Sequence, residues 1–272
     1  MRYGAGLAVL VVGTGDAPFP ATRSAVAALP AGGDADCVVL VDSGTPGGVP
    51  AADRDAEQAM VLRIGEDVGR GAAVNRAVAE LPVDVGFVAV APPRLRWADG
   101  ALTELRAAAV RQPRAGILAP RVRGDGRPVP STHPLPRRAR GVVAVLGGRP
   151  WPPNGGSDPI VEEPVGWSSA PGLLLRRAAL DSVDGFDPRY PARLDDLDLA
   201  DRLARAGWCT VHVPTAMVVH PGSANPGSAH PGSAHPGSAY PGSGARLDTA
   251  APRRYLADRS PRPVRALLRA RY

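Results

Sequence analysis

The chain has 272 residues, of which 44% are hydrophobic, so it can bury one good core and has the apolar content of a soluble protein. Its two cysteines exclude a disulfide framework, and its first apolar run, residues 7–12, is too short for a signal-peptide core or a membrane span, so we expect a cytoplasmic protein. The net charge of +6 equals that of residues 253–272, where seven arginines accompany one aspartate.

This basic C-terminal end suggests an anionic partner, which is either a lipid surface or a nucleic acid. A solubilising or disordered end fits the same arginines equally well. A nucleic acid is disfavoured, because no known nucleic-acid-binding motif with stacking aromatic residues accompanies the arginines. We therefore expect no nucleic-acid binding and keep the anionic membrane surface as the partner of this end.

Apolar runs alternate with helical patterns along the first 120 residues. The apolar runs predict buried strands at residues 7–12, 37–41, 60–64, 85–91 and 115–119, and helices are predicted at 21–29, 69–81 and 101–112. This alternation implies an α/β fold with a mostly parallel sheet, in which ligands bind beyond the carboxyl ends of the strands. Asp42, the 91–94 loop and the loop at Gly69 are expected at that edge.

The second half of the chain is less regular. Residues 121–163 are rich in proline and glycine and predict long loops around a small amount of structure. Regular structure is expected again at 166–177, in a helix from Ala178 and in a strand at 209–214. After His220, five Pro-Gly-Ser units predict a flexible or extended segment that buries no core. The predicted organisation is a domain at 1–220, a low-complexity repeat at 221–244 and an Arg-rich tail at 245–272.

An amphipathic helix is predicted from residue 194, and three acids crowd its start: Asp195, Asp196 and Asp198. They fit two interpretations. The acids cap free N–H groups and complement the helix dipole, or one of them is a general base at the mouth of a site. Further along, the i,i+4 pairs are expected to support the helix itself. These pairs are Asp198 with Arg202 and Asp201 with Arg205.

Several segments, taken in order, resemble inverting family 2 glycosyltransferases with a GT-A fold. They are VLVDS at 39–43, GRGAAVNR at 69–76, GFDPRY at 185–190, DDLDL at 195–199, RLARAGW at 202–208 and the stretch 213–220. Four more segments look like the actinobacterial rhamnosyltransferases of that family, which use dTDP-rhamnose and a polyprenyl-diphosphate-linked GlcNAc acceptor. They are 96–97, 114–120, 164–169 and 255–260.

The resemblance implies a role for each matching residue. Asp196 stands at the position of the catalytic base and Asp195 flanks it, while Asp42 stands where the family hydrogen-bonds the nucleobase. The loop that passes the nucleotide contains Asp67, Gly69 and Arg70. Trp167 and Ser168 are expected near the sugar or acceptor, and His220 stands where the family often has a metal ligand. Two alternatives stay open: Asp42 caps a loop, although the resemblance favours its functional role, and His220 is a structural histidine.

One departure from the family pattern concerns the strand end at 91–97. The family has acids there, and the last of them binds Mg²⁺ or Mn²⁺, whereas this chain has Pro92 and Arg94. A guanidinium cannot bind a divalent cation. Either Arg94 contacts the donor diphosphate in place of the metal, or donor binding is weakened and the chain is a degenerate copy.

We therefore expect a glycosyltransferase that passes a deoxysugar, rhamnose from dTDP-rhamnose, to a lipid-linked cell-wall acceptor by an inverting single displacement. The basic tail is expected to hold it at the inner face of the plasma membrane. The alternative is a catalytically degenerate module that binds a nucleotide or a partner enzyme.

Overall fold

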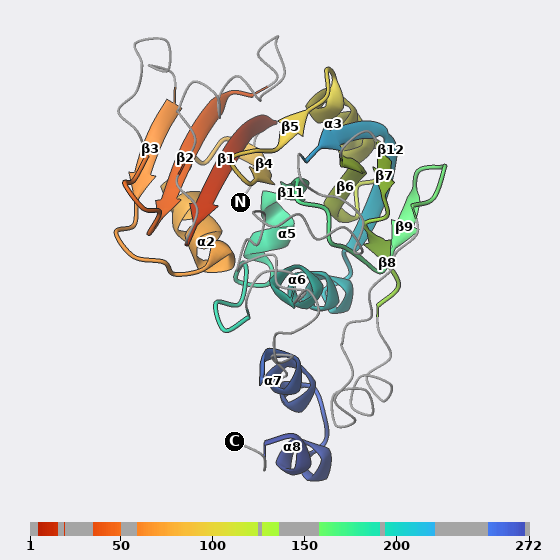
Figure 1. Ribbon diagram of the computed structural model, residues 1–272. Coiled ribbons are helices and arrows are strands. Elements are labelled where there is room, and N and C mark those ends of the chain that lie inside the picture. The colour runs from red at the N-terminus through yellow and green to blue at the C-terminus, as the bar shows by residue number, and fades with distance from the viewer. Residues whose placement is uncertain are drawn as a thin grey trace.

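The computed structural model describes residues 5–15, 19, 35–49, 59–124, 127–135, 158–190, 194–220 and 250–269 (Figure 1). The predicted helix at 21–29 and the predicted repeat at 221–244 lie outside the described residues. Within them, no helix is long and apolar enough to cross a membrane.

A ten-stranded sheet forms the centre of the molecule. Its main path runs β3 (Ala59–Arg63), β2 (Cys37–Ser43), β1 (Gly6–Thr14), β4 (Val85–Ala91), β11 (Leu173–Arg176), β6 (Ala115–Gly124), β12 (Cys209–Val219) and β5 (Arg96–Trp97). Off this path, β7 (Arg127–Val129) pairs with β6, and β9 (Glu163–Val165) pairs with β12. A separate two-stranded sheet joins β10 (Trp167–Ser168) to β8 (Thr132–His133).

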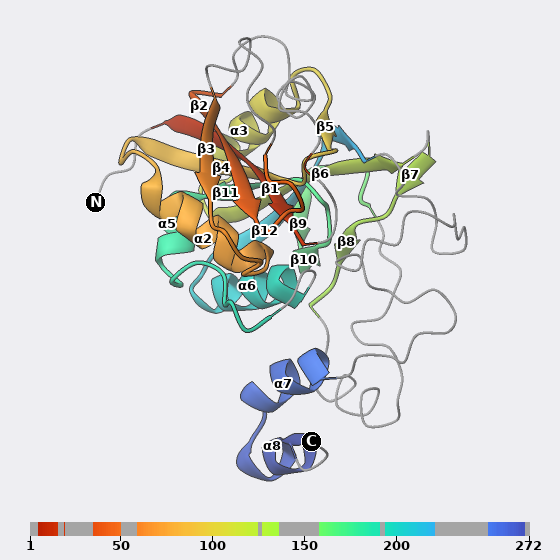
Figure 2. The same ribbon diagram turned by 60° about the vertical axis from the view of Figure 1, so that its left-hand side comes forward.

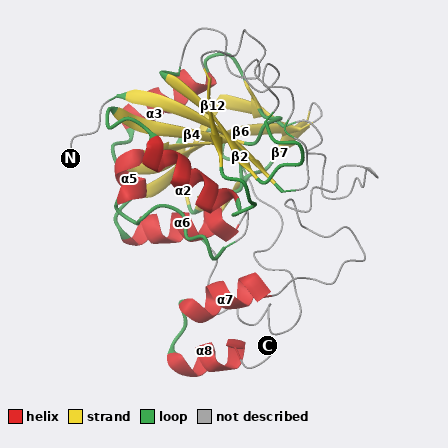
Figure 3. Cartoon of the chain, turned by 90° about the vertical axis from the view of Figure 1, so that its left-hand side faces the viewer, coloured by secondary structure: helices red, strands yellow, loops and turns green. Residues whose placement is uncertain are grey.

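Helices cover both faces of the sheet. Figure 3 shows α3 (Ala101–Arg111) on one face and α2 (Arg70–Glu80), α5 (Arg177–Asp181) and α6 (Leu194–Arg205) on the other. The C-terminal helices α7 (Ala250–Asp258) and α8 (Arg262–Arg269) lie beyond α6, away from the sheet (Figure 2). The described part of the chain is therefore a three-layer α/β body with a helical pair attached to α6.

The central strands are buried because their sequences are continuous apolar runs. Residues 7–12 of β1 are at most 4% exposed, and β1 pairs in parallel with β2 on one side and β4 on the other. Each fully buried leucine or valine stabilises the fold by about 1.5–3 kcal/mol relative to exposure. Among the polar residues buried in the sheet, His212 of β12 is fully buried. Burial lowers the pKa of His212, and the charge of Asp158 opposes that effect.

Most predicted elements of the first 120 residues are confirmed to within a few residues. At 121–163, long loops around a small amount of structure were expected, and the described residues there include the end of β6, the short strands β7 and β8 and the start of β9. The two cysteines, Cys37 and Cys209, are free and half-buried.

The topology brings several loop ends to one edge of the sheet. The chain passes from β1 outward to β2 and β3 and then returns to β4 on the other side of β1, and ligands bind in the crevice at such a reversal. Strands β6 and β12 are parallel to each other and, through the antiparallel β11, to β4. Helix α6 runs back against β12, so its N-terminus lies at this same carboxyl edge.

Candidate active site

Four residues of the sequence motifs form a close contact between α2 and the 185–190 turn. The amide of Asn75 holds both backbone groups of Phe186, donating to its carbonyl at 2.7 Å and accepting from its N–H at 2.9 Å. Gly185 has φ of 69°, and a Cβ there would lie 2.4 Å from Asn75 Oδ1. A Cβ on Gly71 would lie 2.9 Å from the Phe186 side chain. Both glycines are therefore required by close approach between α2 and the 185–190 turn.

Arg70, the first residue of α2, reaches across this contact to the start of α6. Its Nε donates to Asp195 Oδ2 at 3.1 Å, its Nη2 forms an ion pair with the same oxygen at 3.0 Å, and Nη2 donates to Asp196 Oδ1. The guanidinium carbon lies 5.5 Å from the centre of the Phe186 ring, which supports it from below. The resemblance assigned Arg70 to the nucleotide loop, and its contact with both acids was not predicted.

This cluster is largely hidden from water. The side chains of Asp195 and Asp196 are 0% and 7% exposed, and that of Arg70 is 18% exposed. Burial acts to lower the pKa of Arg70, but the two carboxylates outweigh it and raise that pKa. Removing one partner of a buried ion pair typically destabilises a protein by about 3–5 kcal/mol, so Arg70 is needed to keep the two acids together.

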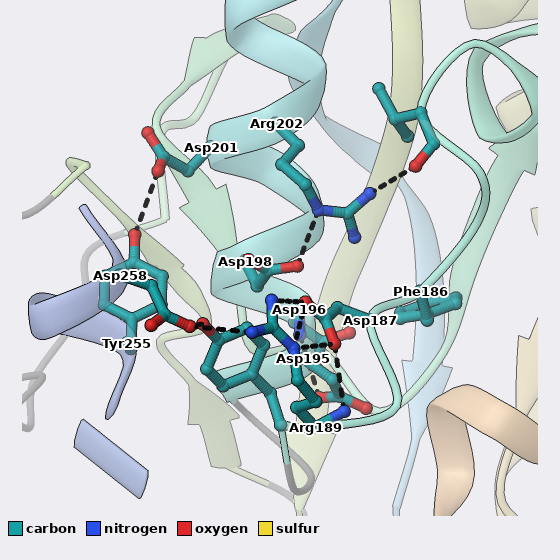
Figure 4. Close-up of polar contacts among 12 residues, drawn as sticks. Phe186, Asp187, Arg189, Asp195, Asp196, Asp198, Asp201, Arg202, Tyr255 and Asp258 are labelled. Carbon is teal, nitrogen blue, oxygen red and sulfur yellow. Dashed lines mark hydrogen bonds and ion pairs between the residues drawn. The ribbon is translucent and has the colours of Figure 1, made fainter. Parts of the chain in front are cut away.

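The other acids of α6 contact the C-terminal part of the chain, and Figure 4 shows Asp201 bonded to the hydroxyl of Tyr255 in α7. Asp198 accepts from Arg202 Nε at 2.7 Å and also contacts Arg259 Nη2, while Asp201 accepts from Arg259 Nε at 2.9 Å. The predicted helix-supporting pairs of Asp198 with Arg202 and Asp201 with Arg205 are confirmed. The acid-rich helix therefore divides its carboxylates between a site-facing pair and a tail-facing pair.

Asp42 lies at the carboxyl end of β2, as expected, and its carboxylate is engaged by the following loop. Oδ1 accepts from Thr45 N at 3.0 Å and from Thr45 Oγ1 at 2.5 Å, and Oδ2 accepts from Val49 N at 3.2 Å. With 7% exposure, Asp42 shapes the loop that would border a nucleobase. Asp67 accepts from Gly69 N at 2.9 Å and so forms the turn that leads into α2.

Trp167 and Ser168 are buried in β10, at 3% and 2% exposure. The Trp167 ring stacks on His133 with centroids 4.5 Å apart. Ser168 Oγ donates to the carbonyl of Ser131 at 3.2 Å and accepts from Ala170 N at 3.1 Å. These two residues hold β10 against β8 and neighbouring loops, so they shape a wall of the molecule with their side chains turned into the protein.

Arg94 and His220 follow β4 and β12 at the carboxyl edge. The short strand β5, two residues after Arg94, pairs with β12, where Arg96 faces Val219, the neighbour of His220. Arg94 is exposed, and the backbone N–H of His220 donates to the carbonyl of Arg123 at 2.9 Å. Throughout the described ranges, no three histidine, cysteine or acidic side chains gather in a way that could hold a metal ion.

The structure thus joins some of the predicted site residues in direct contact and separates others. Arg70, Asp195 and Asp196 form one ion-paired cluster. Asp42, Asp67, Arg94 and His220 lie at other points of the same edge, and Trp167 and Ser168 lie in the wall. The partners of Asp198 and Asp201 on α7 were missed, because Arg259 lies 61 residues from Asp198 and no local pattern links them.

The order of the strands and the helices that cover them can be compared with known folds. No protein-family model matches the chain. Among solved structures, it is similar to Staphylococcus aureus TarS with UDP-GlcNAc (TM-score 0.55, 14% identity, 93% of this chain and 66% of that one) and to GalNAc-T7 with UDP, GalNAc and Mn²⁺ (0.54, 10%, 79% and 44%). It also resembles the mannosyltransferase PcManGT from Pyrobaculum calidifontis (0.51, 19%, 79% and 56%). At these identities the likeness establishes the fold alone, and that fold is the predicted GT-A fold.

Two curated proteins are similar to this chain in sequence. The chain is 39% identical over 201 residues to the N-acetylglucosaminyl-diphospho-decaprenol L-rhamnosyltransferases of two Mycobacterium tuberculosis strains, CDC 1551 / Oshkosh and ATCC 25618 / H37Rv. The match covers 67% of this chain and 66% of each relative, slightly under two thirds of their length. The chain therefore has the GT-A fold and is homologous over 201 residues to these rhamnosyltransferases.

Proposed function

We propose that this protein is an inverting glycosyltransferase that transfers a deoxyhexose, L-rhamnose, from a dTDP-sugar to a polyprenyl-diphosphate-linked GlcNAc. The sugar and the acceptor class are those in the name of the 39% identical relatives. The observation that carries the proposal is the buried cluster of Asp195 and Asp196 at the N-terminus of α6, held by Arg70 at the ligand-binding edge.

Asp196 is the proposed general base. The acceptor hydroxyl attacks the anomeric carbon, its proton passes to the Asp196 carboxylate, and the bond from that carbon to the donor diphosphate breaks with the electrons leaving on the phosphate oxygen. Positioned acid–base groups contribute typically about 10²–10⁴-fold to a rate. In this proposal Arg70 is a positioning residue, since it fixes Asp195 and Asp196 against each other and against Phe186.

The leaving diphosphate needs compensation for its developing negative charge. The described residues do not offer a divalent-metal site, and Arg94 is exposed at the end of β4, where the family has its metal-binding acid. We propose that Arg94 hydrogen-bonds the diphosphate directly, because a guanidinium fork matches phosphate oxygens in a bidentate manner.

The direct test is a transfer assay with dTDP-rhamnose and a GlcNAc-diphospho-lipid, run with and without EDTA. Transfer that survives EDTA and falls in Arg94→Gln supports the proposed role of Arg94. Transfer abolished by EDTA and restored by Mg²⁺ or Mn²⁺ would refute that role while leaving the glycosyltransferase assignment standing. Asp196→Asn must lose transfer in either case.

A second candidate function is a degenerate GT-A module that binds a nucleotide or a partner enzyme without catalysis. It is favoured by Pro92 and Arg94 and by the engagement of both Asp42 carboxylate oxygens within their own loop. Titration with dTDP and dTDP-rhamnose separates the two candidates. Donor binding without transfer to any lipid-linked acceptor selects the degenerate module, and transfer rejects it.

For location, we propose a peripheral protein at the inner face of the plasma membrane. A polyprenyl-linked acceptor resides in the bilayer, and the arginines of residues 253–272 would be attracted to anionic lipids by about 1 kcal/mol each near the surface. Fractionation of cells into membrane and soluble parts, before and after a high-salt wash, tests this placement.

A further inference from the structure

Helices α7 and α8 and the 185–190 turn enclose a cavity of about 280 Å³. It is lined by Arg189, Arg253, Arg254, Asp258, Leu268 and Arg269. Four arginines and one aspartate give this cavity a net charge of +3. It lies on the side of α6 that faces the tail, apart from the cluster of Arg70 with Asp195 and Asp196.

The single carboxylate of the cavity accepts three hydrogen bonds. Asp258 Oδ2 accepts from Arg189 Nη1 at 3.0 Å and from the Tyr190 hydroxyl at 3.0 Å, and Oδ1 accepts from Arg269 Nη2 at 2.8 Å. Two of the four arginines contact this one acid, and Arg189 is also paired with Asp187, whose Oδ2 accepts from Arg189 Nε at 3.1 Å.

Arg253 and Arg254 supply the uncompensated charge. Among the residues that the structure describes, Arg253 Nη1 is a buried donor without a hydrogen-bond partner. Arg254 Nη1 donates to the carbonyl of Arg189 at 3.5 Å, which is a long and uncharged contact. Within that same part of the chain, neither guanidinium forms a salt bridge. Buried polar groups are normally hydrogen-bonded, so the buried Nη1 of Arg253 indicates a place for an acceptor, and the exposed Arg254 lines the same cavity.

The size and chemistry of the cavity define that acceptor. Pockets for drug-sized ligands typically measure about 300–1,000 Å³, so this one is too small for a nucleotide and suits a small anion. Guanidinium forks pair with phosphate oxygens through two parallel hydrogen bonds, and Leu268 adds an apolar wall beside them.

We propose that this arginine cavity binds the phosphate or diphosphate group of a phosphorylated ligand. The inference does not rest on the proposed glycosyl transfer. The cavity is nevertheless joined to the site, because its Arg189 and the Phe186 beneath Arg70 belong to one turn, and Arg259 of the α7–α8 connection binds Asp198 and Asp201 of α6.

A charge-matched pair of variants tests the proposal. Arg253→Gln/Arg254→Gln removes the two uncompensated arginines, and Arg114→Gln/Arg262→Gln removes two exposed arginines outside the cavity. Circular dichroism and thermal melting establish that both doubles fold. Binding is measured at about 0.15 M ionic strength, where screening over roughly 8 Å suppresses diffuse attraction. One arm titrates sodium phosphate and sodium pyrophosphate by calorimetry. The other sediments the protein with phosphatidylcholine vesicles that carry phosphatidic acid or phosphatidylglycerol.

We expect the cavity double to bind pyrophosphate at least about tenfold more weakly than the wild type, with the control double within about twofold, because hydrogen bonds to charged groups are individually strong. Selective loss of binding to phosphatidic acid vesicles in the cavity double identifies a lipid headgroup as the source of the phosphate. Selective loss of pyrophosphate binding alone identifies a soluble phosphate compound. Equal behaviour of the two doubles in both arms, or no binding by the wild type, overturns the proposal.

Discussion

Replacement of Arg70 by glutamine is the sharpest test of the site cluster. The change leaves Asp195, at 0% exposure, and Asp196, at 7%, facing each other without their shared guanidinium. Breaking a buried ion pair costs about 3–5 kcal/mol, and we expect the lower end, about 3 kcal/mol, because Arg70 itself is 18% exposed and water can enter its place. For a chain of this size that corresponds to a fall in Tm of roughly 6–12 °C.

The assay is urea denaturation followed by circular dichroism, with two companion variants. Arg70→Lys keeps the positive charge but not the fork that reaches both acids, so it should lie between glutamine and wild type. Adding Asp195→Asn to Arg70→Gln removes one of the two repelling carboxylates and should recover part of the lost stability. An Arg70→Gln protein within about 0.5 kcal/mol of wild type, the range of ordinary surface changes, would show that the cluster is not held as described.

Five further variants probe separate parts of the molecule. Asp196→Asn should lower the transfer rate by about 10²–10⁴-fold with the fold retained. Asp198→Asn should lower stability and leave the transfer rate unchanged. Rate assays and melting curves on both variants check these two expectations. The stability of the wild type should fall as the pH drops below 6.5, the ordinary histidine pKa. Burial lowers the pKa of His212, so the unfolded chain takes up a proton before the folded one does. In denaturation at about pH 5–7, His212→Val should make the loss of stability with falling pH smaller. Gly185→Ala should lower the unfolding free energy by about 1–3 kcal/mol through strain and the contact with the α2 amide, and an unchanged urea midpoint would contradict that contact. Arg259→Gln should detach the C-terminal helices, and faster trypsin cleavage near residue 250 with the body intact would be the readout.

The strands and the fold class could be predicted from the sequence because the information is local. Residues 7–12 and 85–91 are continuous apolar runs, and such runs are typical of central strands that are buried on both faces of a sheet. The roles of the acids in α6 could not be separated in the same way. Asp195, Asp196, Asp198 and Asp201 stand within one short stretch, and only their distant partners sort them into two groups.

For Trp167 and Ser168, the sequence motif did not distinguish a structural role from a role in binding. Trp167 and Ser168 belong to a motif of the resembled family, yet their side chains are buried in contacts with His133 and Ser131. A motif records that a residue matters to the fold or to the chemistry, and it does not distinguish the two. The substitution of Arg94 for an acid, in contrast, could be recognised from the sequence, since its charge conflicts with a cation at the same place.

The bond between Arg259 and Asp198 spans 61 residues of sequence, and that separation has a consequence for how the chain can change. The entropy of closing a flexible loop grows only with the logarithm of its length, so doubling the intervening chain costs about 0.6 kcal/mol. The sequence predicts that residues 221–244 form such a flexible connection. Gain or loss of whole Pro-Gly-Ser units should therefore be close to neutral for docking of α7 and α8, whereas a single change at either end of the Arg259 contact should not. The connection at residues 221–244 can therefore vary in length, whereas the contact of Arg259 with Asp198 requires both residues.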